Sequence, residues 1–328
     1  MAAKALAPLL DRVVSAIHVC GWQPYILSAR NPYLIQASDG SGESFALRIY
    51  IWNCTPGGGK RAATEYRVQL TIIPAAAQPL EQVIILGWHA SYGVFVAFDP
   101  RKHIDQAGSS PSAQVSEAAL IEANQNIFAA HVNSKGETII AMRPSFLMTY
   151  VASARQLHNF GKAADLSLLN EIGKNRGKSD VDESSEVSLP ERREVMRVVK
   201  RKIRAADFRD RIMAAYKSTC AMCGTQLNLI DAAHILPVES PKSTDDTNNG
   251  IGLCALHHRA FDGALLSFDT NFKIEINDRR IQELAALKLD GGLAAFRGGL
   301  RAVIDLPADK RDHPHSKHIV EGRALRRW

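Results

Sequence analysis

The stretch CAMCGTQLNLIDAAHILPVESPKSTDDTNNGIGLCALHHRAFD (220–262) contains two pairs of metal-ligating residues, each pair separated by two other residues. Cys220 and Cys223 form the first pair, and Cys254 and His257 form the second. Two short turns of this kind can aim four ligands at one ion, and thiolates with imidazole favour zinc over magnesium or calcium. A set closed at four ligands predicts a structural zinc site. The alternative is a group of unrelated buried thiols.

Three further polar residues stand in the same stretch, namely His234, Asn249 and His258. They follow the order C-x2-C, AAHILP, NNG, LC-x2-HH and FD. Residues 208–275 therefore resemble the HNH nuclease superfamily with its ββα-metal fold. The resemblance is nearest to the zinc-containing HNH domains of bacterial restriction enzymes, and it covers about a fifth of the chain.

The resemblance implies a role for each of these residues. His234 corresponds to the general base, and an imidazole with an ordinary pKa near 6.5 suits that role. Asn249 corresponds to the middle Asn, which positions the loop and the base. His258 corresponds to a ligand of one divalent metal, Mg2+ or a substitute such as Mn2+ or Ni2+, on the scissile phosphate. The implied products carry 5′-phosphate and 3′-hydroxyl ends.

The chain departs from the family pattern at one position. Many members have His or Asp directly before the general base as a second metal ligand, whereas this chain has Ala233. Positions 231 and 233 of a strand point to the same face, so Asp231 could supply the carboxylate from two residues away. Asp231 could equally cap a turn. Asp262 is a weaker candidate, better explained as a hydrogen-bonding residue at a helix end.

Composition restricts the class of protein. Hydrophobic residues make up 46% of the 328 residues and charged residues 23%, which is typical of a globular chain. No run approaches the roughly 18 apolar residues of a membrane span, and Asp11 and Arg12 break the run that a signal peptide needs. We expect a cytoplasmic protein with no membrane partner. Cys20 and Cys54, outside the predicted zinc site, are expected to be core thiols.

Charge and composition divide the chain into modules. The segment KNRGKSDVDESSEVSLPE (174–191) has few large apolar residues and is typical of a solvated linker. We therefore expect a recognition domain over residues 1–170, a linker over 171–191 and an HNH nuclease domain over 192–328. The basic C-terminal tail (309–328) is expected to lie near DNA or to be mobile.

A long basic helix is predicted over residues 191–216. The net charge of the chain, +6, permits a nucleic-acid partner without requiring one. Residues 191–217 hold ten basic side chains against four acidic ones. We favour contacts with the phosphates of double-stranded DNA over a merely solvated helix. The basic residues are too dense for one side of a helix: Arg192, Arg193, Arg197, Lys200, Arg201, Lys202 and Arg204.

The predicted fold class is α+β, with a mixed sheet-and-helix domain followed by the ββα-metal domain. An amphipathic helix is expected at the N-terminus, because apolar residues recur there at helical spacing. Alternating or apolar runs at 45–51, 66–72, 82–89, 92–98 and 137–142 predict strands. Ser116 could cap a helix that runs through His131, and a second helix is predicted from Phe146 to about Leu157.

The first module is expected to choose the DNA target. The resemblance implies this, because HNH domains cleave DNA with little sequence preference unless another module directs them. Five aromatic residues could stack on a flipped, modified base, namely Trp52, Trp88, Tyr92, Phe95 and Phe98, and Asp99 could read its edge. The alternative is that these aromatic residues belong to a core. The segment YGVFVAFDPRKH (92–103) is similar to SRA-like readers of modified DNA.

The glycine-rich loop TPGGGKR (55–61) is only superficially like a phosphate-binding loop. It lacks the full G-x-x-x-x-G-K-[ST] pattern, which argues against nucleotide hydrolysis. Lys60 and Arg61 could lie along a DNA backbone, but an ordinary hairpin turn explains the segment better.

Three functions remain open on the sequence alone. The first is a restriction endonuclease directed to specific or modified DNA, and a homodimer is then expected because one HNH site cuts one strand. The second is a defence effector nuclease whose first module senses a small signal and releases nonspecific cleavage. The third is a non-catalytic zinc module that binds DNA.

Overall fold

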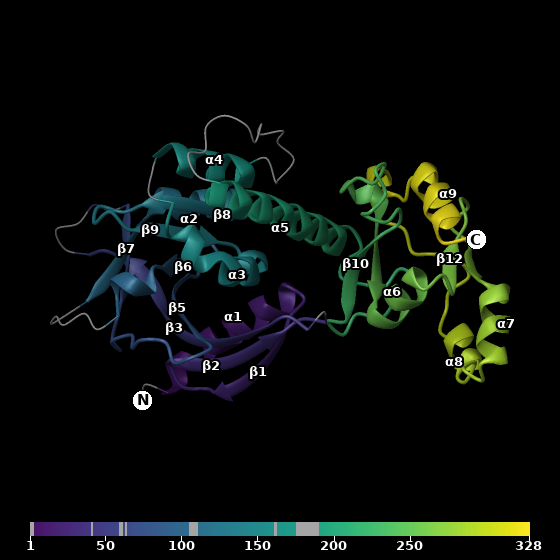
Figure 1. Ribbon diagram of the computed structural model, residues 1–328, viewed down its shortest axis with the longest axis horizontal. Coiled ribbons are helices and arrows are strands. Elements are labelled where there is room, and N and C mark those ends of the chain that lie inside the picture. The colour runs from purple at the N-terminus through teal and green to yellow at the C-terminus, as the bar shows by residue number, and fades with distance from the viewer. Residues whose placement is uncertain are drawn as a thin grey trace. The chain divides into compact units, whose positions relative to one another are not determined.

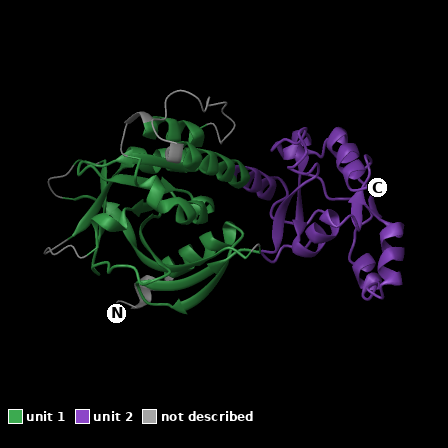
Figure 2. Ribbon diagram, in the orientation of Figure 1, with its two compact units in different colours: residues 1–206 green, residues 207–328 purple. Residues whose placement is uncertain are grey.

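The computed structural model describes residues 3–40, 42–58, 62, 64–104, 111–160, 163–174 and 190–328. The chain forms two compact units, residues 1–206 and 207–328 (Figure 2). Helices and strands occur in both units, so the α+β class is confirmed. No helix in these described ranges is both long enough and apolar enough to cross a membrane.

The first unit is built on a nine-stranded mixed sheet (Figure 1). Its main path runs β1 (Gln23–Ser28), β2 (Tyr33–Ser38), β3 (Ser44–Pro56), β5 (Glu81–His89), β6 (Val94–Phe98), β9 (Thr138–Met142) and β8 (Phe128–Val132). The far end of the long strand β3 pairs with β4 (Glu65–Gln69), which in turn pairs with β7 (Ser112–Ser116). Strands β3 and β5 are parallel, and the other pairs are antiparallel.

Each face of this sheet carries its own hydrophobic core, because successive side chains of a strand point to opposite faces. On β3, Ile49 and Ile51 join the core that also contains helices α1 (Ala3–Val19), α3 (Leu147–Leu157) and α4 (Ala163–Lys174). Tyr50 and Trp52 join the other core, covered by α2 (Glu117–Asn126). The predicted N-terminal helix is confirmed, with its apolar side in the first core.

One helix ends earlier than its sequence pattern suggested. Ser116 does cap α2, since its hydroxyl accepts a hydrogen bond from the backbone N–H of Ala119. The prediction that this helix continues through His131 is wrong, because Ile127 adopts a positive φ of 75° and the chain enters strand β8. The predicted helix from Phe146 to Leu157 is confirmed by α3 and the short 3-10 turn before it.

The second unit places a two-stranded sheet against helices. Strands β10 (Ile230–His234) and β11 (Gly250–Cys254) are antiparallel, and helix α6 (Ala255–Asp262) follows directly. The hairpin of β12 (Leu266–Phe268) and β13 (Ile274–Ile276) comes next. Helices α7 (Asp278–Ala286), α8 (Leu293–Gly298) and α9 (Ser316–Leu325) complete the unit. The basic tail is therefore an ordered helix, with Ile319 in the core, and not a mobile segment.

Helix α5 (Pro190–Ala215) contributes to both units. Met196, Val199 and Ile203 belong to a core of the first unit, whereas Phe208 and Ile212 belong to the core of the second. The compact units thus divide after Ala206, deep within the helix, whereas the expected nuclease domain begins at residue 192, near the start of the helix. Most of the expected linker, residues 175–189, lies outside the described residues.

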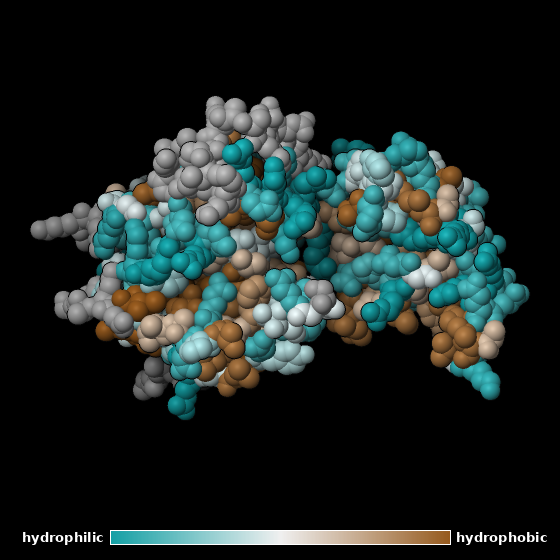
Figure 3. All heavy atoms as spheres, viewed as in Figure 1, coloured by the Kyte–Doolittle hydropathy of each residue, from teal (hydrophilic) through white to brown (hydrophobic). Residues whose placement is uncertain are grey.

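An apolar groove of about 880 Å³ lies between α6, α7 and α8. Leu256 and Leu289 line it and are 62% and 65% exposed. Figure 3 shows hydrophobic residues, in brown, at the surface of this helical region.

Candidate active site and metal centre

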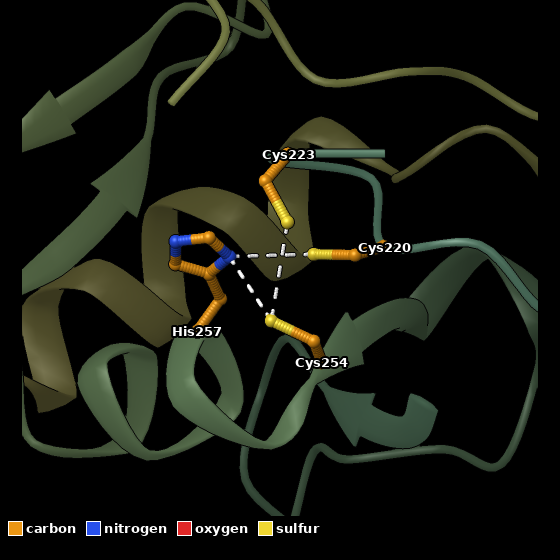
Figure 4. A group of neighbouring side chains, drawn as sticks. All are labelled: Cys220, Cys223, Cys254 and His257. Carbon is orange, nitrogen blue, oxygen red and sulfur yellow. Dashed lines mark hydrogen bonds between the residues drawn. The ribbon is translucent and has the colours of Figure 1, made fainter. Parts of the chain in front are cut away.

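The two ligand pairs of the sequence converge on one point (Figure 4). Cys220 and Cys223 lie in the turn that follows α5, Cys254 ends strand β11, and His257 lies in the first turn of α6. Their ligand atoms all lie within 4.8 Å of one another. Among the residues that the structure describes, this is the one group of three or more His, Cys, Asp or Glu side chains so placed.

The spacing of these atoms fits a tetrahedral zinc ion. The Nδ1 atom of His257 lies 3.4 Å from Cys220 Sγ and 3.3 Å from Cys254 Sγ, and the sulfurs of Cys223 and Cys254 are 3.9 Å apart. Standard Zn–S and Zn–N bonds give separations of about 3.8 Å between sulfurs and about 3.6 Å between sulfur and nitrogen. These three separations are close to the expected values, so the cluster could hold zinc.

The protein environment shifts the pKa values of these ligands in different directions. Burial raises the pKa of the Cys220 thiol to about 12. Burial also opposes ionisation of Cys223, but hydrogen bonds with Thr225 and the neighbouring thiols outweigh it and lower the pKa of Cys223. Burial lowers the pKa of His257, which keeps the imidazole neutral, as a metal ligand must be.

His234 ends strand β10 and is held on two sides. Its ring stacks on Phe208 of α5, with centroids 3.9 Å apart and an interplanar angle of 8°. Its Nε2 atom lies 3.1 Å from Oδ1 of Asp245. Strand register places His234 opposite Gly250, where a Cβ atom would meet Ile212 at 2.2 Å. The glycine of the NNG segment is thus required by the close approach of β11 to α5.

Asn249 is fully buried and fastens the loop between β10 and β11. Its Oδ1 atom accepts from the N–H of Leu236 at 2.9 Å, and its amide nitrogen donates to the carbonyl of Thr244 at 2.8 Å. The amide nitrogen also donates to the hydroxyl of Ser243 at 3.1 Å. Because these bonds join both arms of the loop, Asn249 sets the path of the chain just before Asp245.

His258 lies on α6 between two carboxylates. Its Nδ1 atom is 3.4 Å from Asp231 of β10, and its Nε2 atom is 3.3 Å from Asp262 one turn further along the helix. The hydrogen bond with Asp231 raises the pKa of His258 more than burial lowers it. The same bond lowers the pKa of Asp231, and Arg209 adds to this effect at 3.5 Å. Asp231 thus lies directly beside His258.

Arg326, in the C-cap of helix α9, joins these parts. Its guanidinium donates to the carbonyls of Ile235 at 2.7 Å and of His234 at 3.4 Å, and it approaches Asp262 at 3.4 Å. It also stacks over the ring of Phe261 at 4.3 Å. The pKa of Arg326 is lowered, mainly because its guanidinium is buried.

The residues suggested for a base pocket are not brought together. Trp52 and Trp88 belong to cores on opposite faces of the sheet, and both are at least nine-tenths buried. Asp99 caps a short 3-10 turn and pairs with Arg101 at 2.7 Å. Tyr92 instead donates to Glu117 at 2.8 Å and stacks on His89. Most of these side chains are therefore engaged in packing or internal pairs.

Most of the described basic residues of α5 follow a stripe along the helix, and Lys202 lies off it, so the described basic side chains do not all share one side. The side chains of Arg193, Arg197, Lys200 and Arg204 follow at helical spacings of four and three, along one flank of the buried apolar face. Arg201 lies beside them and is exposed. The Arg192 side chain, and Lys60 and Arg61 of the glycine-rich loop, lie outside the described residues.

Comparison with known families bears on both units. Residues 220–269 match the family model described as HNH endonuclease. The second unit carries an HNH endonuclease domain. Residues 45–151 match the model described as Methylase-associated X1, which corresponds to much of the sheet of the first unit. No curated protein matches the chain.

One solved structure that is similar to the chain is a modification-dependent TagI restriction endonuclease. It shares 11% sequence identity, the match covers 84% of this chain and 80% of that one, and the TM-score is 0.31. At this TM-score the likeness establishes neither a shared fold nor a shared activity.

Three residues that contact the residues of the HNH motif could not be predicted from the spacing of the motif. Phe208 precedes His234 by more than twenty residues, and Arg326 follows it by 92. Asp245 stands in an acidic pair just before NNG. The sequence therefore shows an acidic residue in the loop, but it does not show that this residue contacts His234. Contacts between distant segments decide all three.

Proposed function

We propose that the protein is a restriction-type DNA endonuclease, in which the HNH domain hydrolyses phosphodiester bonds and the first unit selects the target. The observation that carries the proposal is the HNH domain joined in one chain to a methylase-associated module. A methylase methylates DNA. A nuclease paired with it would cleave DNA according to whether that methylation is present or absent. We place this activity on double-stranded DNA in the cytoplasm.

The residues of the HNH domain suit hydrolysis in named roles. His234 would take a proton from water as the water oxygen bonds to phosphorus and the bond to the 3′ oxygen breaks. Asn249 would hold the loop, and His258 with Asp231 would hold a divalent cation such as Mg2+. Such a cation, when bound, compensates the charge on the phosphoryl and leaving oxygens. Cys220, Cys223, Cys254 and His257 would hold a structural zinc ion.

The adjacency of Asp231 and His258 supports the metal pair. A nitrogen and a carboxylate oxygen 3.4 Å apart can bind one ion with little movement. Asp262, on the other ring nitrogen, is also held by Arg326. Asp231 also faces an arginine, Arg209 at 3.5 Å, so we assign the metal to Asp231 on a different ground: it lies on β10, the strand that carries His234.

The test is cleavage of a DNA panel by the full chain with Mg2+. Unmodified, methylated, hydroxymethylated and glucosylated duplexes of one sequence should differ in cleavage, and sequencing of the ends should give 5′-phosphates at defined positions. Equal, context-free degradation of all four would favour a defence effector nuclease instead. A His234→Ala variant as active as the wild type would contradict the HNH mechanism.

We further propose that two copies act together on a duplex, because each chain offers one HNH domain and one such site cuts one strand. Nicked intermediates should then accumulate at low protein concentration, and linear product should rise more steeply than in proportion to concentration. Sedimentation with uncleavable duplex provides the independent measure of stoichiometry.

A further inference from the structure

The loop that leads into β11 places a carboxylate against the candidate general base. Oδ1 of Asp245 lies 3.1 Å from Nε2 of His234, and the two side chains are only 13% and 20% exposed. We infer that Asp245 is a positioning residue that fixes the tautomer and orientation of His234. This inference rests on the proposed function, in which His234 accepts a proton from water.

The contact determines which ring nitrogen is free to react. An ionised carboxylate can only accept hydrogen bonds, so the Nε2 atom of His234 must carry the proton that it donates to Asp245. The lone pair of the neutral ring is then on Nδ1, which is the atom left to take a proton from water. When the ring becomes an imidazolium, the carboxylate stabilises the new positive charge.

Orientation is fixed by a second contact. Phe208 lies face to face with the imidazole at 3.9 Å, which restricts tilting of the ring, while Asp245 restricts its rotation in the plane. A base held in this way loses little freedom when it reacts. The arrangement matches the logic in which a third group orients the base that activates a nucleophile.

Asp245 is itself held firmly from α5. The guanidinium of Arg211 donates to the backbone carbonyl of Asp245 at 2.6 Å and to the hydroxyl of Thr247 at 2.8 Å. Arg211 is paired at 2.8 Å with Asp207, which is only 4% exposed. On the other side, the amide of Asn249 holds the carbonyl of Thr244. The backbone is thus fixed on both sides of the carboxylate.

The experiment compares Asp245→Asn with Asp246→Asn, which removes the same charge from the next residue of the loop. Both are measured in the full chain with a DNA that the wild type cleaves and saturating Mg2+. We expect Asp245→Asn to lower kcat by more than about 10-fold, against the roughly 10²–10⁴-fold that a general base contributes. KM for DNA and the melting temperature should stay close to those of the wild type. Asp246→Asn should keep kcat within about 2-fold of the wild type.

Two further measurements separate positioning from a structural role. Adding Asp245→Asn to His234→Ala should cause no further loss, because the carboxylate acts only through the imidazole. Nitrogen-15 shifts of the His234 ring should report the Nε2-protonated tautomer in the wild type and a mixture of tautomers in Asp245→Asn. The second readout does not depend on activity.

The inference is overturned if Asp245→Asn keeps wild-type kcat, if Asp246→Asn loses as much, or if the losses of Asp245→Asn and His234→Ala add. In each case an inactive His234→Ala would leave the proposed nuclease function intact. If His234→Ala itself remains active, the proposed function fails, and the tautomer measurement alone then shows whether the contact orders the ring.

Discussion

The carbonyl oxygen of Ile235 accepts a hydrogen bond of 2.7 Å from Arg326, although the two residues are 91 positions apart. This bond anchors the end of strand β10, directly after His234, to the last helix of the chain. The matched part of the HNH family model ends at residue 269, so the anchor comes from sequence outside that match.

Arg326→Met should destabilise the second unit. The variant keeps an apolar stem over Phe261 but leaves the carbonyl of Ile235 without the guanidinium that donates to it. Loss of a partner for buried acceptors costs about 1–3 kcal/mol. Urea unfolding followed by circular dichroism measures the change. Arg311→Met is the control, because the Arg311 side chain is 89% exposed and pairs with Asp309 at the surface, so the urea midpoint should stay close to that of the wild type.

Zinc content should be one ion per chain and should fall in Cys254→Ser. Metal binding requires a thiolate, and burial raises the pKa of Cys220 to about 12 in the metal-free cluster, so zinc must displace a proton. Lower pH therefore weakens binding, and higher pH strengthens it. Elemental analysis and chelator competition at several pH values measure both effects. Cys20→Ser, outside the cluster, should leave the stoichiometry unchanged; equal zinc loss in both variants would contradict the assignment.

The first unit should lose stability on acidification through His158. This ring is 6% exposed, its Nδ1 lies 2.7 Å from the carbonyl of Thr138, and its Nε2 lies 3.0 Å from the hydroxyl of Tyr150. Burial lowers the pKa of His158 in the folded state. The unfolded chain therefore binds the extra proton first, and stability falls by up to about 1.4 kcal/mol per pH unit below about 6.5.

Thermal unfolding of the wild type and of His158→Gln over this pH range checks the effect. The variant should be less stable at neutral pH but also less sensitive to acid. His18→Gln, at a half-buried position of α1, should retain the acid sensitivity of the wild type. An unchanged slope in His158→Gln would assign the acid response to other groups.

The stripe on α5 should bind DNA backbone. Replacing Arg197, Arg201 or Arg204 with Gln should weaken binding to every duplex alike and reduce the slope of log K against log salt by about 0.9 for each lost phosphate contact. Fluorescence anisotropy at several salt concentrations measures both. Lys202→Gln, which lies off the stripe, is the matched control. If the control changes the slope as much as the stripe variants, general charge explains the affinity.

Asp231→Asn should raise the Mg2+ concentration needed for half-maximal cleavage, because it removes the carboxylate beside His258 that we propose as a ligand. Asp262→Asn provides the comparison, since it alters the other ring nitrogen of the same imidazole. A Mg2+ dependence that changes only in the second variant would reverse the assignment. An unchanged dependence in both would remove these carboxylates from the metal site.

The parts of the second unit that are close in sequence were the parts that could be predicted. Two C-x2-C/H pairs constrain their own geometry, and the four ligand atoms do converge. The strand, loop and helix that carry His234, Asn249 and His258 also follow the motif. Asp245 and Arg326 could not be assigned to His234, because their contacts depend on how loops and a distant helix pack.

The first unit was harder to predict for a related reason. Short apolar runs identified most of its strands. Alternation along one strand does not show how that strand pairs with others, so it does not show which side chains of different strands share a face of the sheet. Trp52 and Trp88 therefore looked like members of one pocket, although pairing of β3 with β5 sends them to different cores. The predicted helix was too long because helical apolar spacing continued past Ile127. At that residue φ is positive, the helix ends, and strand β8 follows.

Helix α5 has a practical consequence for dissecting the protein. A fragment that begins at residue 192 would expose Met196, Val199 and Ile203 to water and deprive the partner fragment of part of its core. One that begins at Asp207 would retain Phe208 and Ile212 under β10 and β11. Separate expression of the two units therefore calls for a cut inside α5, after Ala206, so that residues 190–206 of the helix stay with the first unit.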